Sequence, residues 1–226
     1  MPQKTRTISL MLPFHMTRVN CYLVEAGEGH VLIDTGSSNR RAELRRELDG
    51  AGCKPGSLKL IVLTHGDFDH SGNAAYLRRE FGAKIGMQRD DAGMIERGDM
   101  FFNRKKPNAL IRALLPLVFG LGESDRFEPD VYLEDGDDLS PYGFAAGVLR
   151  LPGHSKGSIG VLTAEGDLFC GDLLGNTDEP ELNSVMDDLT AANASVARLK
   201  GLGIGTVYPG HGEAFLMEAF LGNKQV

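Results

Sequence analysis

The sequence is poor in cysteine. Its three cysteines, Cys21, Cys53 and Cys170, lie far apart and form neither a Cys-x-x-Cys pair nor a zinc-finger spacing. This odd, scattered set argues against a disulfide framework and against a cysteine-based zinc site. Cys21 and Cys170 stand inside apolar, strand-like runs, where a small buried thiol packs well. We therefore expect reduced, buried thiols.

Long apolar runs are also missing. No stretch approaches the roughly 20 apolar residues that a membrane-spanning helix needs. The short apolar run near the beginning ends at Pro13-Phe14, which makes a poor signal peptide. We expect a cytoplasmic protein without stable membrane insertion.

An excess of basic residues is absent as well. The formal net charge is -7 at pH 7, so the field of the whole molecule does not attract phosphate backbones or anionic membranes. We expect no nucleic-acid partner.

The composition is that of an ordinary globular protein. The 226 residues are 42% hydrophobic and 24% charged, and no break in composition marks a domain boundary. The 29 glycines favour strands and tight turns over a helix bundle. We predict one domain over residues 1–226.

Strands and helices alternate along the chain. An early strand meander followed by helix, strand and helix predicts a mixed α/β sheet rather than an all-β barrel. Ser38 is the expected cap of the first helix, and Leu189, Val196 and Leu199 are the expected buried face of the last. The predicted strands are 8–14, 19–26, 30–35, 58–63, 84–88, 131–133, 143–151, 158–163, 167–172 and 206–208, and the predicted helices are 38–49, 74–81, 90–97 and 185–199.

A segment at about residues 90–127 looks like a helical insertion. It holds a basic run, Arg104-Lys105-Lys106, and a strongly apolar run at 110–121 that includes Pro116. A dozen apolar residues are too few to cross a bilayer. Three interpretations stay open: a lid or a homodimer contact through residues 108–121, a plain core helix, and a membrane-surface contact.

The densest chemistry follows the predicted strand at 58–63. His65, Asp67, Asp69 and His70 fall within six residues, and Gly66 lets the chain turn there. A polar loop that merely caps the next helix is the plain alternative. It leaves two imidazoles and two carboxylates crowded without a reason, because crowded like charges need a cation. We therefore interpret this stretch as a metal site.

Three later strands also end in residues that bind metals. His154 follows Leu151-Pro152-Gly153, Asp172 follows an apolar strand, and His211 follows Pro209-Gly210. Functional residues of α/β folds collect at strand ends. We expect all four strand ends to converge on one cleft.

With these motifs the sequence resembles the metallo-β-lactamase superfamily. The family's His-x-His-x-Asp-His motif is matched by His65-x-Asp67-x-Asp69-His70, and its later ligands by His154, Asp172 and His211. The resemblance covers about residues 19–220 except the insertion. It implies a four-layer αββα sandwich with two mixed β-sheets.

The resemblance also implies a ligand set for two divalent metal ions. His65, Asp67 and His154 would bind the first ion, and Asp172 would bridge to the second. Asp69, His70 and His211 would bind that second ion. Two such ions share a hydroxide that attacks a carbonyl or phosphoryl centre. Asp69 is the candidate catalytic residue, which orients this hydroxide and passes a proton to the leaving group.

Asp67 departs from the family, which usually has a histidine there. Asp67, Asp69, Asp172 and a hydroxide carry four negative charges against the four positive charges of two ions, whereas a histidine would leave three. A further hard oxygen ligand favours iron or manganese over zinc. The alternative is that Asp67 stands outside the coordination shell and one metal binds.

The leading functional interpretation is a metal-dependent hydrolase of a small ester, lactone or thioester. Glyoxalase II-like thioester cleavage is weakened by the lack of an evident C-terminal helical domain for glutathione. An iron-dependent oxidoreductase similar to persulfide dioxygenases, a phosphodiesterase and a non-catalytic metal-binding module are the alternatives.

Three further residues have two interpretations each, and a fourth has one. Asp34, at a strand end, either supports a metal ligand or shapes a turn. Lys156 either meets an anionic substrate or is simply exposed. His15 either reaches the cleft or lies on the surface, and His30 is expected to be solvated.

Overall fold

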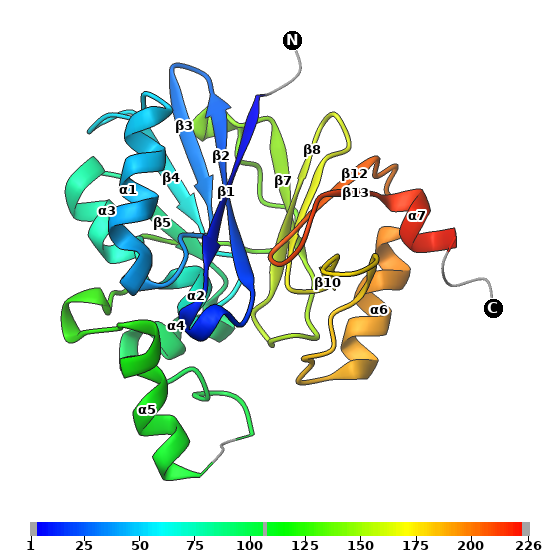
Figure 1. Cartoon of the computed structure of the whole chain (residues 1–226). Helices are drawn as coiled ribbons and strands as arrows, with labels where there is room; N and C mark the ends of the chain where they lie inside the picture. The colour runs from blue at the N-terminus through cyan, green and yellow to red at the C-terminus, as the bar shows by residue number, and fades with distance from the viewer. Residues whose placement is uncertain (1–3, 106–107, 223–226) are drawn as a thin grey trace.

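Two mixed β-sheets lie side by side in the computed structural model, with helices on their outer sides (Figure 1). The structure describes residues 4–105 and 108–222.

The first sheet has six strands in the order β1-β2-β3-β4-β5-β6. The first three strands pair antiparallel, and β3 to β6 pair parallel. The bounds are β1 (Thr5–Met11), β2 (Arg18–Ala26), β3 (Gly29–Ile33), β4 (Leu58–Val62), β5 (Lys84–Met87) and β6 (Val131–Tyr132).

The second sheet has five strands in the order β13-β12-β9-β8-β7. Only its β12–β9 pair is parallel. The bounds are β7 (Ala146–Arg150), β8 (Ile159–Thr163), β9 (Leu168–Gly171), β12 (Thr206–Pro209) and β13 (Phe215–Leu216). A separate two-stranded ribbon joins β10 (Leu174–Gly175) to β11 (Glu181–Leu182).

Successive side chains of a strand point to opposite faces of its sheet, and this divides the core into layers. In β4, Leu60 and Val62 face the second sheet and pack in one cluster with Val161 and Phe169. Ile61 points the other way, into the cluster under the helices of the first sheet. A strand with apolar residues on both faces is buried on both, because successive side chains point to opposite sides.

Helices cover the outer face of each sheet. The first sheet carries α1 (Arg41–Gly50), α3 (Ala74–Phe81) and α4 (Arg89–Arg97), whose apolar residues share its outer cluster. The second sheet carries α6 (Leu189–Leu199) and α7 (Met217–Gly222). The short α2 (Phe68–Ser71) follows β4, and α5 (Ala109–Phe119) projects at the lower end in Figure 1. The predicted αββα sandwich with two mixed sheets is therefore confirmed.

Several predicted details were wrong. The first strand ends at Met11, because Pro13 cannot donate a ladder hydrogen bond and Phe14 has a φ of 58°. Ser38 lies in a 3-10 turn, and α1 begins three residues later without a side-chain cap. Leu189 is 59% exposed at the start of α6, while Val196 and Leu199 are buried as predicted.

The segment at 90–127 contains two different helices. Most residues of α4 are buried, including Met94 and Ile95. In α5, Leu110 and Leu117 are 68% and 75% exposed. None of the described helices is both long and apolar enough to cross a bilayer. The single domain over 1–226 and the insertion stay predictions, and residues 106 and 107 and both chain ends lie outside the described residues.

Candidate metal centre

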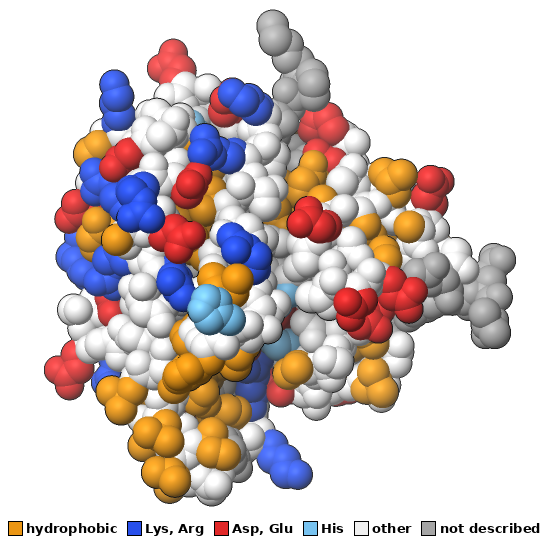
Figure 2. Space-filling view, viewed as in Figure 1, with side chains coloured by type: hydrophobic (Ala, Val, Ile, Leu, Met, Phe, Trp, Pro, Cys, Tyr) orange, Lys and Arg blue, Asp and Glu red, His pale blue; other side chains and the backbone are white. Residues whose placement is uncertain are grey.

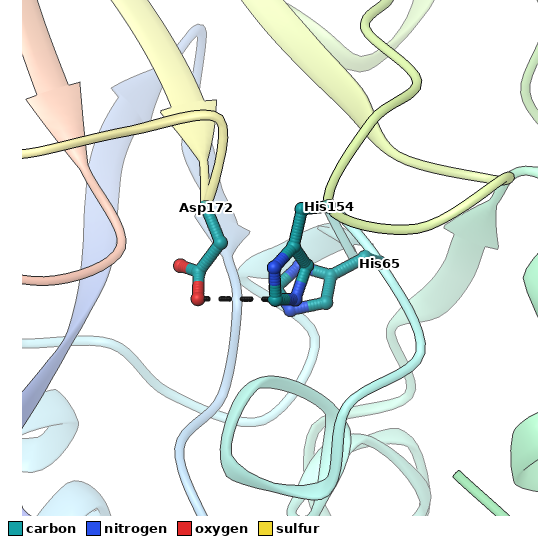
Figure 3. Close-up of side chains that lie close together, drawn as sticks. All are labelled: His65, His154 and Asp172. Carbon is teal, nitrogen blue, oxygen red and sulfur yellow. Dashed lines mark ion pairs between the residues drawn. The ribbon is translucent and has the colours of Figure 1, made fainter. Parts of the chain in front are cut away.

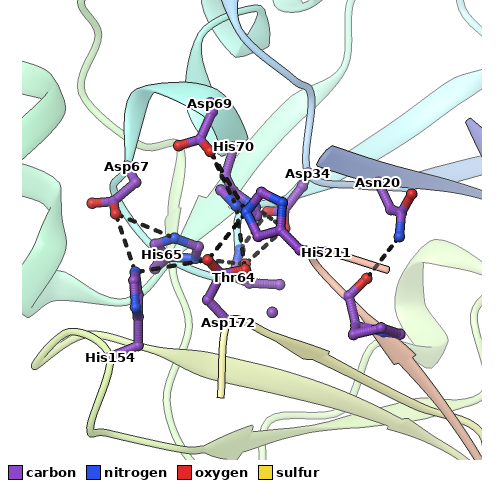
Figure 4. A network of polar contacts seen from close by, with 12 residues as sticks. Asn20, Asp34, Thr64, His65, Asp67, Asp69, His70, His154, Asp172 and His211 are labelled. Carbon is purple, nitrogen blue, oxygen red and sulfur yellow. Dashed lines mark hydrogen bonds and ion pairs between the residues drawn. The ribbon is translucent and has the colours of Figure 1, made fainter. Parts of the chain in front are cut away.

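The ends of four strands meet at one edge of the sandwich (Figure 4). The loop and first turn after β4 carry four of the seven predicted residues. The other three follow β7, β9 and β12. The structure brings all seven together: His65, Asp67, Asp69, His70, His154, Asp172 and His211.

Three side chains form a first group. Ligand atoms of His65, His154 and Asp172 all lie within 4.8 Å of one another (Figure 3). Asp67 faces the same group, since its Oδ2 lies 3.1 Å from His154 Nε2 and 3.7 Å from His65 Nε2.

A second group lies next to the first. Ligand atoms of Asp69, His70 and His211 also lie within 4.8 Å of one another. Asp172 faces both groups. Its Oδ1 is 3.4 Å from His70 Nε2, and its Oδ2 is 3.3 Å from His211 Nε2 and 4.0 Å from His154 Nε2.

All four histidines are oriented in the same way. Each ring has its Nδ1 within hydrogen-bond distance of a protein oxygen, which leaves Nε2 to face the centre. Such contacts fix the tautomer and the orientation of metal-binding imidazoles. The partners are Thr64 Oγ1 for His65 (2.9 Å), Asp34 Oδ2 for His70 (2.8 Å), the Val185 carbonyl for His154 (2.7 Å) and the Arg18 carbonyl for His211 (2.6 Å).

Asp34 links two of these contacts. Its carboxylate accepts hydrogen bonds from the Thr64 amide (2.8 Å) and the Thr64 hydroxyl (2.7 Å) and lies against His70 Nδ1. Asp34 is 2% exposed and has a φ of 58°. The structure therefore favours the supporting role for Asp34. Thr64 was not predicted from the sequence, although it stands directly before the first histidine.

The donor set fits a divalent metal. Among the described residues, His65 Nε2, His70 Nε2 and Asp172 Oδ1 are buried without a hydrogen-bond partner. Such orphaned polar atoms are rare in folded proteins and call for an explanation. Four imidazoles and three carboxylates gathered in two adjacent groups provide it, because nitrogen and oxygen ligands of this kind bind zinc, iron and manganese.

The electrostatics of the centre are strongly coupled. Burial opposes ionisation of Asp172, but the charges of His211 and His70 hold its pKa well below the usual range. Burial raises the pKa of Asp69. Burial also opposes protonation of His154, yet its hydrogen bond and charge interaction with Asp67 raise its pKa to about 9.

Two charged residues near the centre were also not predicted from the sequence. Asp91, in α4, is 1% exposed and accepts hydrogen bonds from the Gly66 amide (3.0 Å), the Ser155 hydroxyl (2.6 Å) and the Gly157 amide (2.8 Å). It thereby ties together the loops that carry His65 and His154. Arg104 forms an ion pair with Asp67. Of these two residues, only Arg104 stood in a stretch noted from the sequence, the basic run that contains it.

A cleft of about 440 Å³ opens onto the centre. Asp67, Asp69, His154, Asp172 and His211 form its polar floor. One wall is apolar and comes from the residue before the 3-10 turn Pro13–His15, from the segment after α4, and from α5. Its members are Leu12, Met100, Phe101, Leu115 and Phe119.

Two weaker candidates are not among the residues that line the cleft. Lys156 is 67% exposed and forms an ion pair with Asp90 (3.4 Å), so the structure favours its simple surface role. His15 is exposed in the 3-10 turn Pro13–His15.

The fold and these residues together agree with one known family. A family model described as the metallo-beta-lactamase superfamily matches residues 17–211. The chain belongs to the metallo-beta-lactamase superfamily. The resemblance inferred from the motifs is therefore confirmed.

Curated members of the superfamily include two similar enzymes. The chain is 32% identical over 208 residues to hydroxyacylglutathione hydrolase GloC from Haemophilus influenzae, which covers 85% of this chain and 89% of that protein. It is 30% identical over 176 residues to the acyl-coenzyme A thioesterase MBLAC2 from Bos taurus, with 70% of this chain and 58% of that protein covered.

Solved structures of the superfamily have the same fold. TTHA1623, solved in a di-iron-bound form, is 30% identical with a TM-score of 0.69, and the match covers 93% of this chain and 96% of that one. The family protein TTHA1429 from Thermus thermophilus is 26% identical with a TM-score of 0.71, covering 97% and 78%.

Proposed function

We propose that this protein is a dinuclear metal-dependent hydrolase that cleaves a small thioester. The observation that carries the proposal is the convergence of four histidine Nε2 atoms and three carboxylates at the floor of one cleft.

The two groups of side chains suggest how the ligands divide. His65, Asp67 and His154 would hold one divalent ion, and Asp69, His70 and His211 would hold the other. Asp172 faces both groups and could serve both ions. Two such ions supply a hydroxide nucleophile at neutral pH and polarise the substrate carbonyl.

Asp69 is the proposed catalytic carboxylate. It lies in the first turn of α2 at the cleft floor, with Oδ2 at 3.7 Å from His211 Nε2. One oxygen would stay with the second group, and the other would orient the attacking hydroxide, accept its proton as it adds to the carbonyl, and pass this proton to the thiolate leaving group.

The thioester class is supported by the relatives and by the cleft. GloC is a hydroxyacylglutathione hydrolase and MBLAC2 an acyl-coenzyme A thioesterase, and both names denote enzymes that cleave a thioester. The apolar wall at Leu115 and Phe119 suits an acyl group. A small ester or lactone presents the same reacting carbonyl, so both belong in the test.

The experiment is a hydrolysis panel on protein loaded with Zn²⁺, Fe²⁺ or Mn²⁺ and on metal-depleted protein. The panel holds a hydroxyacylglutathione, an acyl-coenzyme A, a lactone, an aryl ester and a phosphodiester. We expect thioester cleavage that needs about two metal ions per chain and is lost on chelation. Phosphodiester cleavage alone, or equal turnover without metal, refutes the proposal.

Iron-dependent oxidation is the second candidate. It is favoured by the carboxylate ligand Asp67 and by the di-iron form of the relative TTHA1623. Oxygen consumption by the iron-loaded protein with a thiol persulfide, without any ester or thioester cleavage, would replace the hydrolase proposal by this one.

A further inference from the structure

Arg104 is a buried cation beside the candidate centre. Its side chain is 9% exposed and forms ion pairs with Asp67 Oδ1 and with Asp187 Oδ2 (Nε at 2.6 Å). Its Nη2 donates to the His154 carbonyl oxygen (3.2 Å). Arg104 therefore contacts Asp67 directly and holds the loop of another member of the first group.

The ion pair with Arg104 uses only one oxygen of Asp67. Arg104 lies against Oδ1, whereas Oδ2 lies 3.1 Å from His154 Nε2 and 3.7 Å from His65 Nε2. The carboxylate is therefore turned so that one oxygen meets the guanidinium and the other faces the histidines. This geometry leaves Oδ2 available to a metal ion.

We propose that Arg104 is the counter-ion of Asp67, so that the Asp67–Arg104 pair takes the electrostatic place of the neutral histidine usual at this position in the family. The inference rests on the proposed metal site. Arg104 is a positioning residue, because it acts on the metal through Asp67.

Charge counting supports this role. Asp67, Asp69, Asp172 and a hydroxide carry four negative charges, and Arg104 brings this total to minus three. A neutral histidine at position 67 without the arginine gives the same total. The extra negative charge of Asp67 therefore no longer favours iron or manganese over zinc. The hard oxygen of the Asp67 carboxylate still does.

Two other carboxylates act on Arg104 but stand outside the counted ligands. Asp187 is 37% exposed, so water screens its charge. Asp91 is buried, and its oxygens accept hydrogen bonds from Gly66, Ser155 and Gly157 rather than facing the centre. Among the described contacts of Arg104, Asp67 is the partner that is both buried and directed at the centre.

The test is a set of variants in which charge is removed singly and together. Calorimetric titration of metal-depleted protein with Mn²⁺ or Zn²⁺ gives the affinity of each ion, and plasma mass spectrometry gives the number bound. The variants are Arg104→Gln, Asp67→His and the double variant. Arg104→Lys keeps the charge, and Arg198→Gln, which removes the ion pair with Asp135 (2.6 Å), is a control away from the centre.

We expect opposite effects of the two single substitutions. Arg104→Gln removes a cation beside the first ion and tightens its binding, on the order of tenfold. Asp67→His removes the buried partner of Arg104 and leaves the guanidinium, still paired with Asp187, beside a neutral imidazole. We expect this substitution to weaken that binding by a similar factor. The double variant returns close to the wild-type affinity. Arg104→Lys and Arg198→Gln stay near wild type.

Two outcomes overturn the inference. If Arg104 only holds the loop, Arg104→Gln weakens metal binding and the double variant is worse than Asp67→His. If Arg104 replaces the first ion, the wild type binds one ion and Arg104→Gln binds two. Neither readout needs turnover, so a failure of the thioesterase proposal leaves this test intact.

Discussion

Asp34 carries an unusual share of the support for the centre. One buried carboxylate accepts two hydrogen bonds from Thr64 and also contacts His70 Nδ1. Its backbone φ is 58°, a value that residues other than glycine adopt infrequently. Such a backbone persists where surrounding contacts determine it. These hydrogen bonds hold the Asp34 carboxylate in place, although its backbone conformation is an unfavourable one.

Replacing Asp34 by Asn tests this role. The substitution keeps the size of the side chain and removes the charge that orients His70 and, through Thr64, His65. We expect metal affinity to fall about 10- to 100-fold, measured by competition with a chelating dye. Asp125→Asn is the matched control, because Asp125 is equally buried but pairs with Arg41. Equal losses in both variants would contradict the assignment.

The three thiols give a pH prediction. Burial is the largest cause of the raised pKa of all three, and it raises that of Cys170 to about 12. A raised pKa keeps the unreactive neutral thiol at about pH 8. We expect negligible reaction with a disulfide reagent in the native protein, with reactivity of Cys170 rising only toward pH 12, and three reactive thiols per chain in denaturant. Rapid native labelling would show an open core.

The sequence predicted the seven residues of the centre because each follows an apolar strand at a fixed motif position. It did not predict Arg104 or Asp91. Both act across long sequence separations, with Arg104 reaching Asp67 and Asp91 reaching Gly157. A charged residue in a polar segment looks the same whether it is solvated or paired, so only the packing of 90–104 against the centre reveals these two contacts.

Among the elements, α4 connects the two loops that carry His65 and His154, through the hydrogen bonds of Asp91. Asp91→Ala leaves the Gly66 and Gly157 amides buried without this acceptor. We expect a loss of about 3 kcal/mol in the free energy of unfolding, measured by urea titration. Asp90→Ala removes two partly exposed ion pairs on the same helix, with Arg150 and Lys156, and should cost less than about 1 kcal/mol. Similar losses in the two variants would show that α4 does not brace the loops.

The two faces of α5 predict different effects on substrate binding. Leu115 lines the cleft, whereas Leu117 is 75% exposed. Leu115→Ala removes apolar surface that would contact the acyl group, and we expect KM for the thioester substrate to rise roughly tenfold. Leu117→Ala should leave KM unchanged, which is checked with the same steady-state assay. An unchanged KM in Leu115→Ala would remove α5 from the substrate site.

The sequence predicted which segments form helices and strands better than it predicted where each helix or strand begins and ends. The ends of β1 and the start of α1 differ from prediction because local chemistry at Pro13 and around Ser38 overrides the apolar pattern. The ribbon of β10 and β11 was missed, since two-residue strands have no detectable period.

At the scale of the molecule, α5 presents apolar side chains to solvent. Its outer face consists of Leu110, Ile111, Leu114 and Leu117, which are 45% to 75% exposed. Figure 2 shows hydrophobic side chains gathered at the lower end of the molecule, where Figure 1 places α5. Exposed apolar patches of this kind commonly mark contacts.

We predict that this outer face mediates a homodimer. Leu110→Glu together with Leu117→Glu places charges in the contact, so sedimentation velocity should show a dimer for the wild type and a monomer for the variant. Glu123→Lys is a charge-changing control near α5 but outside this face. A monomeric wild type at high micromolar concentration refutes the prediction.

The division of the centre between the two sheets has a consequence for biosynthesis. The residues at 65–70 follow a strand of the first sheet, whereas His154, Asp172 and His211 follow strands of the second. During synthesis, the four residues at 65–70 leave the ribosome long before His211 does. The full constellation arises only after both sheets have docked, so maturation of the centre is a late step that follows folding.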